Sequence, residues 1–504
     1  MILLIVLKDI SIKFKFKFKL ILLMNEHEHE QKERFKDISF INNISSMAVI
    51  GVSERRKFFF LRNHQEHFQG ELYAIHPKIK SIPNFDDGTQ EKIFRTVKDV
   101  PGKVDFAFIA VPPTKIIEVI DDCVEKGVKL VSIFTAEFSD AGTEEGRKLE
   151  KKLLEHAQNK LRILGPNGMG LYYPKLGIAW RPKFPHTSGR IGFIAQSGGI
   201  CNIAIYASQE LGMSYSKVFS FGNGADLDFV DLLHFLINDS ETEIILGYIE
   251  GLAKGRGVAL QEALANNKKP TIMLKGGKSK MGSVAAKTHT GTLTGKKTMW
   301  EVIFRQYGVI NVDTIEQLLN TARLIHSYGL FNISNIAILS VSGGYGVVLV
   351  DLLAHYGLNI FPFNTEIQKQ LDQQFFTLGT SSNNPLDVSA QIYNSESIYN
   401  IIDIALSDKN IDGLIMDLPT WYFNMDYHLT KDPNFEPTIL KAFSLGHKHN
   451  KPLVPIIQRV NCPEDRIRLL RELNERKVPV FGDPFEFVPL LPKISAQYIK
   501  MKSR

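Results

Sequence analysis

Four consecutive residues, Gln196-Ser197-Gly198-Gly199, follow one apolar run and open another. The first run has the length of a buried strand and the second has helical spacing. Glycines at a strand-to-helix turn let backbone N–H groups approach a ligand closely, and the start of a helix carries about half a positive charge. The segment therefore indicates a site for a phosphate or an oxyanion. A tight turn without a ligand explains the same residues equally well.

A second candidate is His289, which lies in the stretch MGSVAAKTHTGTLTGKK. Because this stretch is rich in Gly, Ser and Thr and has little apolar periodicity, we expect it to form an exposed loop. A neutral imidazole there is free to act as a nucleophile near neutral pH. The chain has 14 histidines, however, so an ordinary surface role is an open alternative.

A third candidate is Glu250, which ends the apolar run EIILGYIE. In parallel α/β sheets, functional side chains gather at the carboxyl ends of strands. A carboxylate in that place can accept the N–H of an imidazole and stabilise its positive charge. The alternative is an ordinary strand-end charge that faces water.

The elements that must hold these residues fall into three blocks, at residues 45–172, 188–325 and 330–495. In each block, short apolar runs alternate with longer helical patterns, which is typical of parallel α/β units. The expected fold class is therefore α/β, with three Rossmann-like or flavodoxin-like parallel-sheet domains in tandem. Residues 1–44 are expected to be an N-terminal extension, disordered or non-native, because the apolar start and the Lys–Phe alternation lack the order of a signal peptide.

The second and third blocks contain copies of one unit. GFIAQSGGICNIAIYASQELG and IAILSVSGGYGVVLVDLLAHYG both comprise a strand, a Ser-Gly-Gly turn, an apolar helix and a closing glycine. The distance from Ser197 to Gly212 equals that from Ser342 to Gly357. Two copies of one supersecondary unit predict two related domains. The second copy has no reactive neighbour in the sequence, so we expect a structural turn there.

Composition limits the class of protein. A net charge of +6 over 504 residues is too dilute to predict nucleic-acid binding. Three cysteines without a CxxC pair favour a reducing cytoplasm and no zinc site, and no metal ligands are assigned. No apolar run reaches about 18 residues, so neither a membrane span nor a membrane partner is expected. Gly51-Val52-Ser53 is not the glycine fingerprint that a nicotinamide-dependent oxidoreductase needs.

Taken in order, these motifs resemble the ADP-forming acyl-CoA synthetases of the succinyl-CoA synthetase superfamily. The resemblance covers about residues 45–495 and is closest to the alpha subunits of acetate–CoA ligases. It rests on segments spread along the chain: GVS at 51–53, AVPP at 110–113, GPNG at 165–168, QSGG at 196–199, FSFGNGADLDFVDLLHFL at 219–236, YIEG at 248–251, THTG at 288–291, SVSGG at 340–344 and NPLD at 384–387. Two departures stand out: Glu54-Arg55-Arg56 replaces the usual Pro-x-Lys-type stretch, and His76 stands where Asn or Thr is usual.

The resemblance implies a role for each candidate. His289 is the residue that is phosphorylated, and Glu250 orients it. The backbone at Gln196, Ser197, Gly198 and Gly199 holds the phosphoryl group. The residues implied in CoA binding are Gly51, Ser53, Lys57, Lys78, Val111, Pro112 and Asn167.

The resemblance also implies a partner. The family needs an ATP-grasp domain to make ATP, and the sequence leaves no room for one. We therefore expect a separate ATP-grasp beta subunit, which carries Mg and ADP or ATP, in a hetero-oligomer that uses CoA, phosphate and an acyl-CoA or carboxylic acid. The alternative is a CoA-binding regulatory or scaffold homologue without ligase activity.

Overall fold

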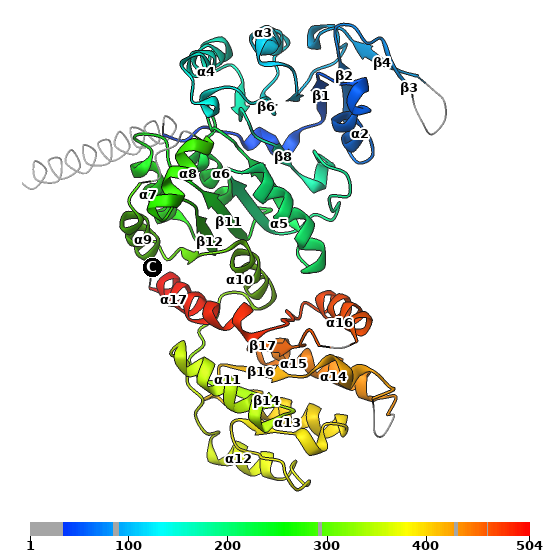
Figure 1. Cartoon of the computed structure of the whole chain (residues 1–504), viewed down its shortest axis with the longest axis vertical. Helices are drawn as coiled ribbons and strands as arrows, with labels where there is room; N and C mark the ends of the chain where they lie inside the picture. Colours follow the sequence, from blue (N-terminus) through cyan, green and yellow to red (C-terminus); the bar gives the residue numbers. More distant parts are fainter. Residues whose placement is uncertain (1–33, 84–89, 291–294, 428–431, 461, 504) are drawn as a thin grey trace, which may run out of the picture.

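The computed structural model describes residues 34–83, 90–290, 295–427, 432–460 and 462–503. It contains three sheets, each flanked by helices, and the three units follow one another along the long axis of the molecule (Figure 1). The first two sheets are parallel except at one edge, and the third is parallel throughout. The expected α/β fold with three parallel-sheet units is thus confirmed. In the described part, no helix is both long and apolar enough to cross a membrane.

The first sheet has the strand order β3-β4-β2-β1-β5-β6-β7. Its central strands are buried along their whole length, as expected for a parallel sheet covered on both faces. Only β3 and β4 pair antiparallel. The elements are β1 (Ser46–Ile50), α2 (Phe59–Gln65), β2 (Glu71–Ile75), β3 (Ser81–Pro83), β4 (Gln90–Phe94), β5 (Phe106–Ile109), α3 (Ile116–Lys126), β6 (Leu130–Ile133), α4 (Glu144–Ala157) and β7 (Arg162–Leu164).

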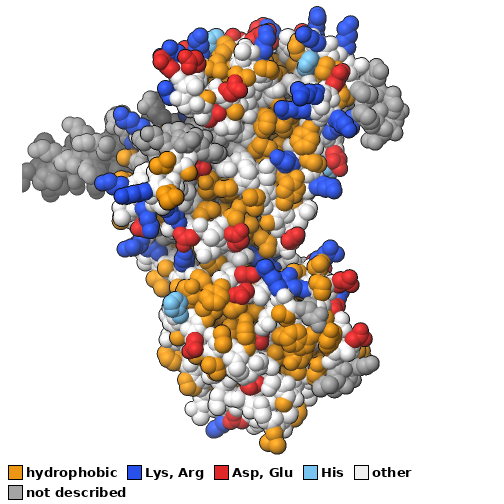
Figure 2. Space-filling view, viewed as in Figure 1, with side chains coloured by type: hydrophobic (Ala, Val, Ile, Leu, Met, Phe, Trp, Pro, Cys, Tyr) orange, Lys and Arg blue, Asp and Glu red, His pale blue; other side chains and the backbone are white. Residues whose placement is uncertain are grey.

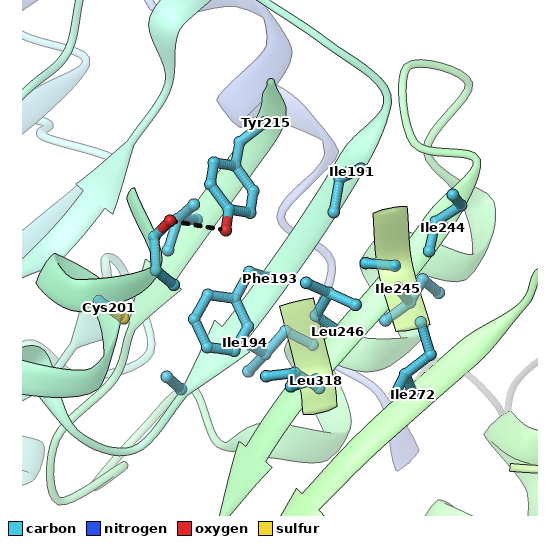
Figure 3. Close-up of a cluster of buried hydrophobic side chains, with 14 of the residues drawn as sticks. Ile191, Phe193, Ile194, Cys201, Tyr215, Ile244, Ile245, Leu246, Ile272 and Leu318 are labelled. Carbon is cyan, nitrogen blue, oxygen red and sulfur yellow. Dashed lines mark hydrogen bonds between the residues drawn. The ribbon is translucent and has the colours of Figure 1, made fainter. Parts of the chain in front are cut away.

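The second sheet has the order β13-β12-β11-β9-β10-β8, with β8 antiparallel to β10. Figure 3 shows part of its core, where Phe193 of β9 and Leu246 of β11 are register partners on the sheet face that α10 covers with Leu318. The elements are β8 (Gly170–Tyr172), β9 (Ile191–Ala195), α5 (Gly198–Glu210), β10 (Tyr215–Ser220), α6 (Phe229–Asn238), β11 (Ile244–Ile249), α7 (Gly257–Asn266), β12 (Thr271–Lys275), α8 (Lys280–Thr290), α9 (Lys297–Gln306), β13 (Ile310–Val312) and α10 (Ile315–Tyr328).

The third sheet has the order β15-β14-β16-β17. The final helix leaves this unit and packs beside β13 of the second sheet, where Lys493 donates to the carbonyl oxygen of Asn311 at 3.0 Å (Figure 1). The elements are β14 (Ile336–Ser340), α11 (Gly343–His355), α12 (Thr365–Asp372), β15 (Leu386–Asp387), α13 (Ser395–Ser407), β16 (Gly413–Asp417), α14 (Phe435–Phe443), α15 (Leu445–His449), β17 (Leu453–Ile456), α16 (Pro463–Glu475) and α17 (Leu491–Lys502).

The internal repeat is visible in the topology. The order β12-β11-β9-β10 in the second sheet matches β17-β16-β14-β15 in the third. Ser197 caps α5 and Ser342 caps α11, and each side chain accepts a hydrogen bond from the backbone N–H three residues on. Both Ser-Gly-Gly turns therefore begin a helix, as the spacing predicted.

Part of the predicted N-terminal extension is packed. Residues 1–33 lie outside the described part, but Phe35, Ile38 and Ile41 are buried in the core. Lys36 donates its backbone N–H to Asp231 of α6 at 3.1 Å. Residues 34–44 are therefore held against the second unit.

Candidate active site

A cavity of about 890 Å³ lies at the carboxyl ends of β1 and β5 and reaches the start of α5. Nine of the residues singled out in the sequence line it: Gly51, Ser53, Val111, Pro112, Asn167, Gln196, Ser197, Gly198 and Gly199. The cavity thus joins the CoA-binding and phosphate-binding sets that were assigned separately. Among the described side chains, Lys57, Lys78 and Glu250 are not lining residues.

The turn after β1 requires glycine. Gly51 has a φ of +93°, and a Cβ atom there would lie 2.6 Å from the carbonyl oxygen of Ala110. Its N–H donates to the carbonyl oxygen of Ile75 at 3.0 Å. A side chain would force β1 and β5 apart at the mouth of the cavity, so the glycine keeps this end of the sheet closed.

A second turn, at Asn167, connects the first two units. The Asn167 N–H donates to the carbonyl oxygen of Thr135 at 2.9 Å in the first unit. A Cβ atom on the next residue, Gly168, would lie 2.5 Å from the carbonyl oxygen of Ser220 in the second. This close approach explains how one cavity takes its walls from both units.

The start of α5 forms the far end of the cavity. The Ser197 hydroxyl accepts from the N–H of Ile200 at 3.4 Å, which fixes the first turn of the helix. Gly198 lies so close to Met169 that a Cβ atom would be 2.4 Å from its Cγ. Gly198 and Gly199 both line the cavity, so the positive end of the α5 dipole faces it. The arrangement suits an anion.

Glu250 is linked to this helix start through a hydrogen bond with Gln196. It follows β11 and is only 5% exposed, so the alternative of a strand-end charge facing water is wrong. Its backbone N–H donates to the side-chain oxygen of Gln196 at 3.0 Å. The Tyr248 hydroxyl donates to its carboxylate at 2.9 Å, and burial together with that carboxylate holds the pKa of Tyr248 above its ordinary value. Tyr248 therefore stays a hydrogen-bond donor.

His289 lies in the last turn of α8, and its side chain is outside the described part of the structure. The expectation of an exposed loop is wrong for this segment, because residues 280–290 are helical. The Ser279 hydroxyl accepts from the N–H of Gly282 at 2.9 Å, and Ala285 and Ala286 favour a helix. The apolar stripe was missing because Met281 and Val284 face solvent. The pairing of His289 with Glu250 stays a prediction.

The cavity has basic lining residues that the sequence reasoning did not assign. Arg55, Arg56, Arg95 and Lys115 line it. Figure 2 shows Lys and Arg side chains gathered beside hydrophobic ones on the part of the first unit that carries α2. Arg55 and Arg56, which follow the GVS turn closely, were recognisable in the sequence as a basic pair. Arg95 and Lys115 come from separate elements and have no local sequence signature.

The unusual His76 fits the cavity wall. Its Nδ1 accepts from the backbone N–H groups of Lys78 and Ile79 at 3.1 and 3.0 Å. Partial burial, with the neighbouring Lys78 charge, holds the pKa of His76 below its ordinary value. A neutral imidazole with its proton on Nε2 thus shapes this turn, a task that an Asn side chain also performs.

The second Ser-Gly-Gly turn differs at the helix start. A Cβ atom on Gly343 would lie 2.6 Å from a carboxylate oxygen of Asp387. The side-chain carboxylate of Asp387 therefore lies against the positive end of α11. This supports a structural turn at Ser342.

Comparison with known proteins places the chain in a family. Residues 45–174 match the CoA binding domain family, and residues 188–325 match the succinyl-CoA ligase like flavodoxin domain. The chain is 34% identical to "Acetate--CoA ligase [ADP-forming] II subunit alpha" of Pyrococcus furiosus over 427 residues, which is 82% of this chain and 91% of the relative. It is 32% identical to "Acetate--CoA ligase [ADP-forming] I" of Archaeoglobus fulgidus, of which the match spans 54%.

A solved structure agrees with these relatives. The dinucleotide-forming acetyl-coenzyme A synthetase 1 of Ca. Korarchaeum cryptofilum, in complex with phosphate and ADP, is similar with a TM-score of 0.78 at 27% identity. The similarity covers 92% of this chain and 98% of that chain. Motif order, sheet topology and sequence identity lead to the same assignment. The chain belongs to the ADP-forming acetate–CoA ligase family, and within it to the alpha-subunit type.

Proposed function

We propose that this chain is the CoA-binding, phosphohistidine-bearing subunit of an ADP-forming acyl-CoA synthetase, which interconverts acyl-CoA, ADP and phosphate with acid, CoA and ATP. The observation that carries the proposal is the single cavity that runs from the Gly51 turn to the start of α5. It brings a place for a large anionic thiol ester next to a place for phosphate.

The cavity suits the two parts of CoA. Arg55, Arg56 and Arg95 offer positive charge for phosphate groups, and the side chains of Phe59 and Phe134 offer apolar walls. CoA bound across Gly51 and Val111 then directs its thiol ester towards Gly198. Lys57 and Lys78 are exposed near the same turns and reach the phosphates only from outside the lining.

The chemistry needs two transfers on this chain. A phosphate oxygen attacks the thioester carbonyl carbon, the C–S bond breaks, and acyl phosphate and the CoA thiolate form. An imidazole nitrogen of His289 then attacks phosphorus, and the carboxylate leaves. The α5 start stabilises the charge on the phosphoryl oxygens, and Glu250 stabilises the imidazolium. The expected domain bounds 45–172 and 330–495 differ from the sheets at two places, since β8 pairs with β10 of the second sheet and α17 packs beside β13.

A separate ATP-grasp beta subunit completes the reaction. It would bind Mg and ADP, and it would take the phosphoryl group from His289 to make ATP. The support is the near full-length match to a relative named as an alpha subunit, beside a longer ligase of which the match spans 54%. The isolated chain is therefore expected to make no acyl-CoA from acid, ATP and CoA until that subunit is added.

The test is phosphoryl labelling of the chain. Given acyl-CoA and labelled phosphate without nucleotide, the wild-type chain should acquire label that is labile to acid and stable to base, as a phosphoramidate is. His289→Asn should abolish the label while CoA binding remains. His355→Asn, a change of an exposed histidine on α11, is the control and should label normally.

Two results would contradict the proposal. Label that survives in His289→Asn would place the nucleophile elsewhere. A wild-type chain that binds CoA but never labels, with the partner present and several acyl-CoAs tried, would favour a regulatory or scaffold role.

A further inference from the structure

A buried lysine contacts the backbone of Glu250, the residue that carries the candidate catalytic carboxylate. Lys275 is the last residue of β12, pairs in register with Ile249 at the end of β11, and is only 4% exposed. Its ammonium donates to the carbonyl oxygen of Glu250 at 2.6 Å and also to that of Gly276. A lysine this deeply buried is uncommon unless its charge is paired or its hydrogen bonds are satisfied. The burial and the hydrogen bonds of Lys275 therefore indicate that it has a specific role in the site.

The lysine completes a clamp on one peptide segment. The N–H of Glu250 is held by Gln196, which follows β9, and the carbonyl oxygen of Glu250 is held by Lys275 from β12. Side chains from the two strands that flank β11 thus fix both backbone groups of the residue. The direction of the Glu250 side chain depends on this backbone geometry.

The same ammonium contacts the segment that follows His289. Its nitrogen lies 5.4 Å from the centre of the Trp300 ring on α9, within reach of a cation–π interaction. Trp300 in turn lies against Gly295, where a Cβ atom would be 3.1 Å from the indole nitrogen. Lys275 therefore contacts both the Glu250 turn and the helix that follows the His289 segment in the chain.

We propose that Lys275 is a positioning residue for Glu250: it fixes the Glu250 peptide and keeps a positive charge beside the carboxylate during phosphoryl transfer to His289. This inference rests on the proposed function. A carboxylate stabilises the imidazolium only if it is directed at it, and the fixed Glu250 peptide sets that direction.

The charge on Lys275 is sensitive to pH. Burial lowers the pKa of Lys275 to about 8, the Glu250 carboxylate acts in the opposite direction, and Lys278 lowers it further. Among the residues that the structure describes, the neighbouring charged or titratable groups have partners of their own: Lys278 pairs with Asp313 at 2.7 Å, Lys297 with Glu301 at 3.6 Å, and Tyr248 bonds Glu250. Raising the pH through about 8 therefore removes the charge beside Glu250.

The test is the rate of His289 labelling from acyl-CoA and labelled phosphate, measured in the full-length chain from pH 6.5 to pH 9.5. The wild-type rate should fall above about pH 8. Lys275→Arg keeps a charge at all these pH values, so the fall should move to higher pH. Lys275→Met should lower the maximal rate about 10- to 100-fold, as loss of a supporting partner does, and leave the KM for acyl-CoA unchanged.

Lys278→Met is the matched control. That lysine lies three residues on but donates to Asp313 and the carbonyl oxygen of Val312, so the maximal rate should be unchanged. The alkaline fall should remain and move less than in Lys275→Arg, because loss of the Lys278 charge raises the pKa of Lys275 but leaves its ammonium able to lose a proton. CoA binding reports folding of each variant. A wild-type rate that stays flat to pH 9.5, a Lys275→Arg profile that does not move, or a Lys275→Met maximal rate equal to wild type would each overturn the inference. A wild-type chain that never labels would instead refute the proposed function.

Discussion

The side-chain oxygen of Gln196 accepts a hydrogen bond from the backbone N–H of Glu250 at 3.0 Å. The two residues are 54 positions apart in the chain and follow the neighbouring strands β9 and β11. The backbone N–H of Gln196 in turn donates to the carbonyl oxygen of Tyr248 at 3.2 Å. Through these two hydrogen bonds, Gln196, which begins the anion site, also fixes the backbone of Glu250, which carries the candidate catalytic carboxylate.

Replacing Gln196 should therefore separate binding from transfer. Gln196→Leu keeps the size but leaves the buried N–H of Glu250 without its acceptor, which typically costs about 1–3 kcal/mol. We expect the rate of His289 labelling to fall about 10- to 100-fold, with CoA affinity little changed. Single-turnover labelling and CoA titration measure the two effects. Equal losses in both would mean that Gln196 contacts CoA instead.

Gly51→Ala should damage the cavity mouth. The residue must adopt a φ of +93°, and its Cβ would lie 2.6 Å from the Ala110 carbonyl oxygen. Strained backbone costs about 1–3 kcal/mol, so both the melting temperature and the CoA affinity should fall. Gly127→Ala is the control, since Gly127 has a φ of +78° but nothing within 4 Å. If the two variants bound CoA equally well, the close approach to Ala110 would not matter for the site.

The lining arginines should contribute to CoA affinity through charge. Arg55→Ala and Arg95→Ala should each weaken CoA binding about 3- to 10-fold, near 1 kcal/mol, because both side chains are exposed and screened. The loss should shrink as salt rises. Calorimetric titration at two ionic strengths measures this. Lys57→Ala tests the residue chosen from the sequence: a larger loss there than at Arg55 would favour Lys57 as the phosphate partner.

The third unit should become more stable as the pH falls from 7 towards 5. Burial raises the pKa of Asp417 to about 6, although Gln458 and Ser340 donate to it. A carboxyl whose pKa is raised in the folded state destabilises the fold in full above about pH 6, and this cost shrinks as the pH falls from there towards the ordinary carboxyl pKa of about 4.

Asp417→Asn should accordingly stabilise the protein at pH 7.5 by about 1–3 kcal/mol and have little effect at pH 4. Thermal unfolding of wild type and variant at both pH values checks the sign. A variant that is less stable than wild type at pH 7.5 would show that the ionised carboxylate is needed for packing at this strand end.

The sequence by itself determined the local structure and much of the candidate site. Alternating apolar runs predicted the parallel sheets, and the glycine turn at Gly51 and the helix start at Ser197 were readable because their causes are local: a backbone that excludes a side chain, and a hydroxyl that caps the first turn. The order of the motifs then indicated the family.

Only the tertiary structure decided which residues from distant parts of the chain lie together in the site. Arg95 and Lys115 line the cavity, and Lys275 bonds to Glu250 across 25 residues, because sheet register and the contact between the first two units bring distant segments together. Such contacts leave no periodicity in the sequence. The segment before His289 was misjudged for a related reason: a helix that exposes its apolar residues, such as Met281 and Val284, shows no stripe, and its cap and alanines alone specify it.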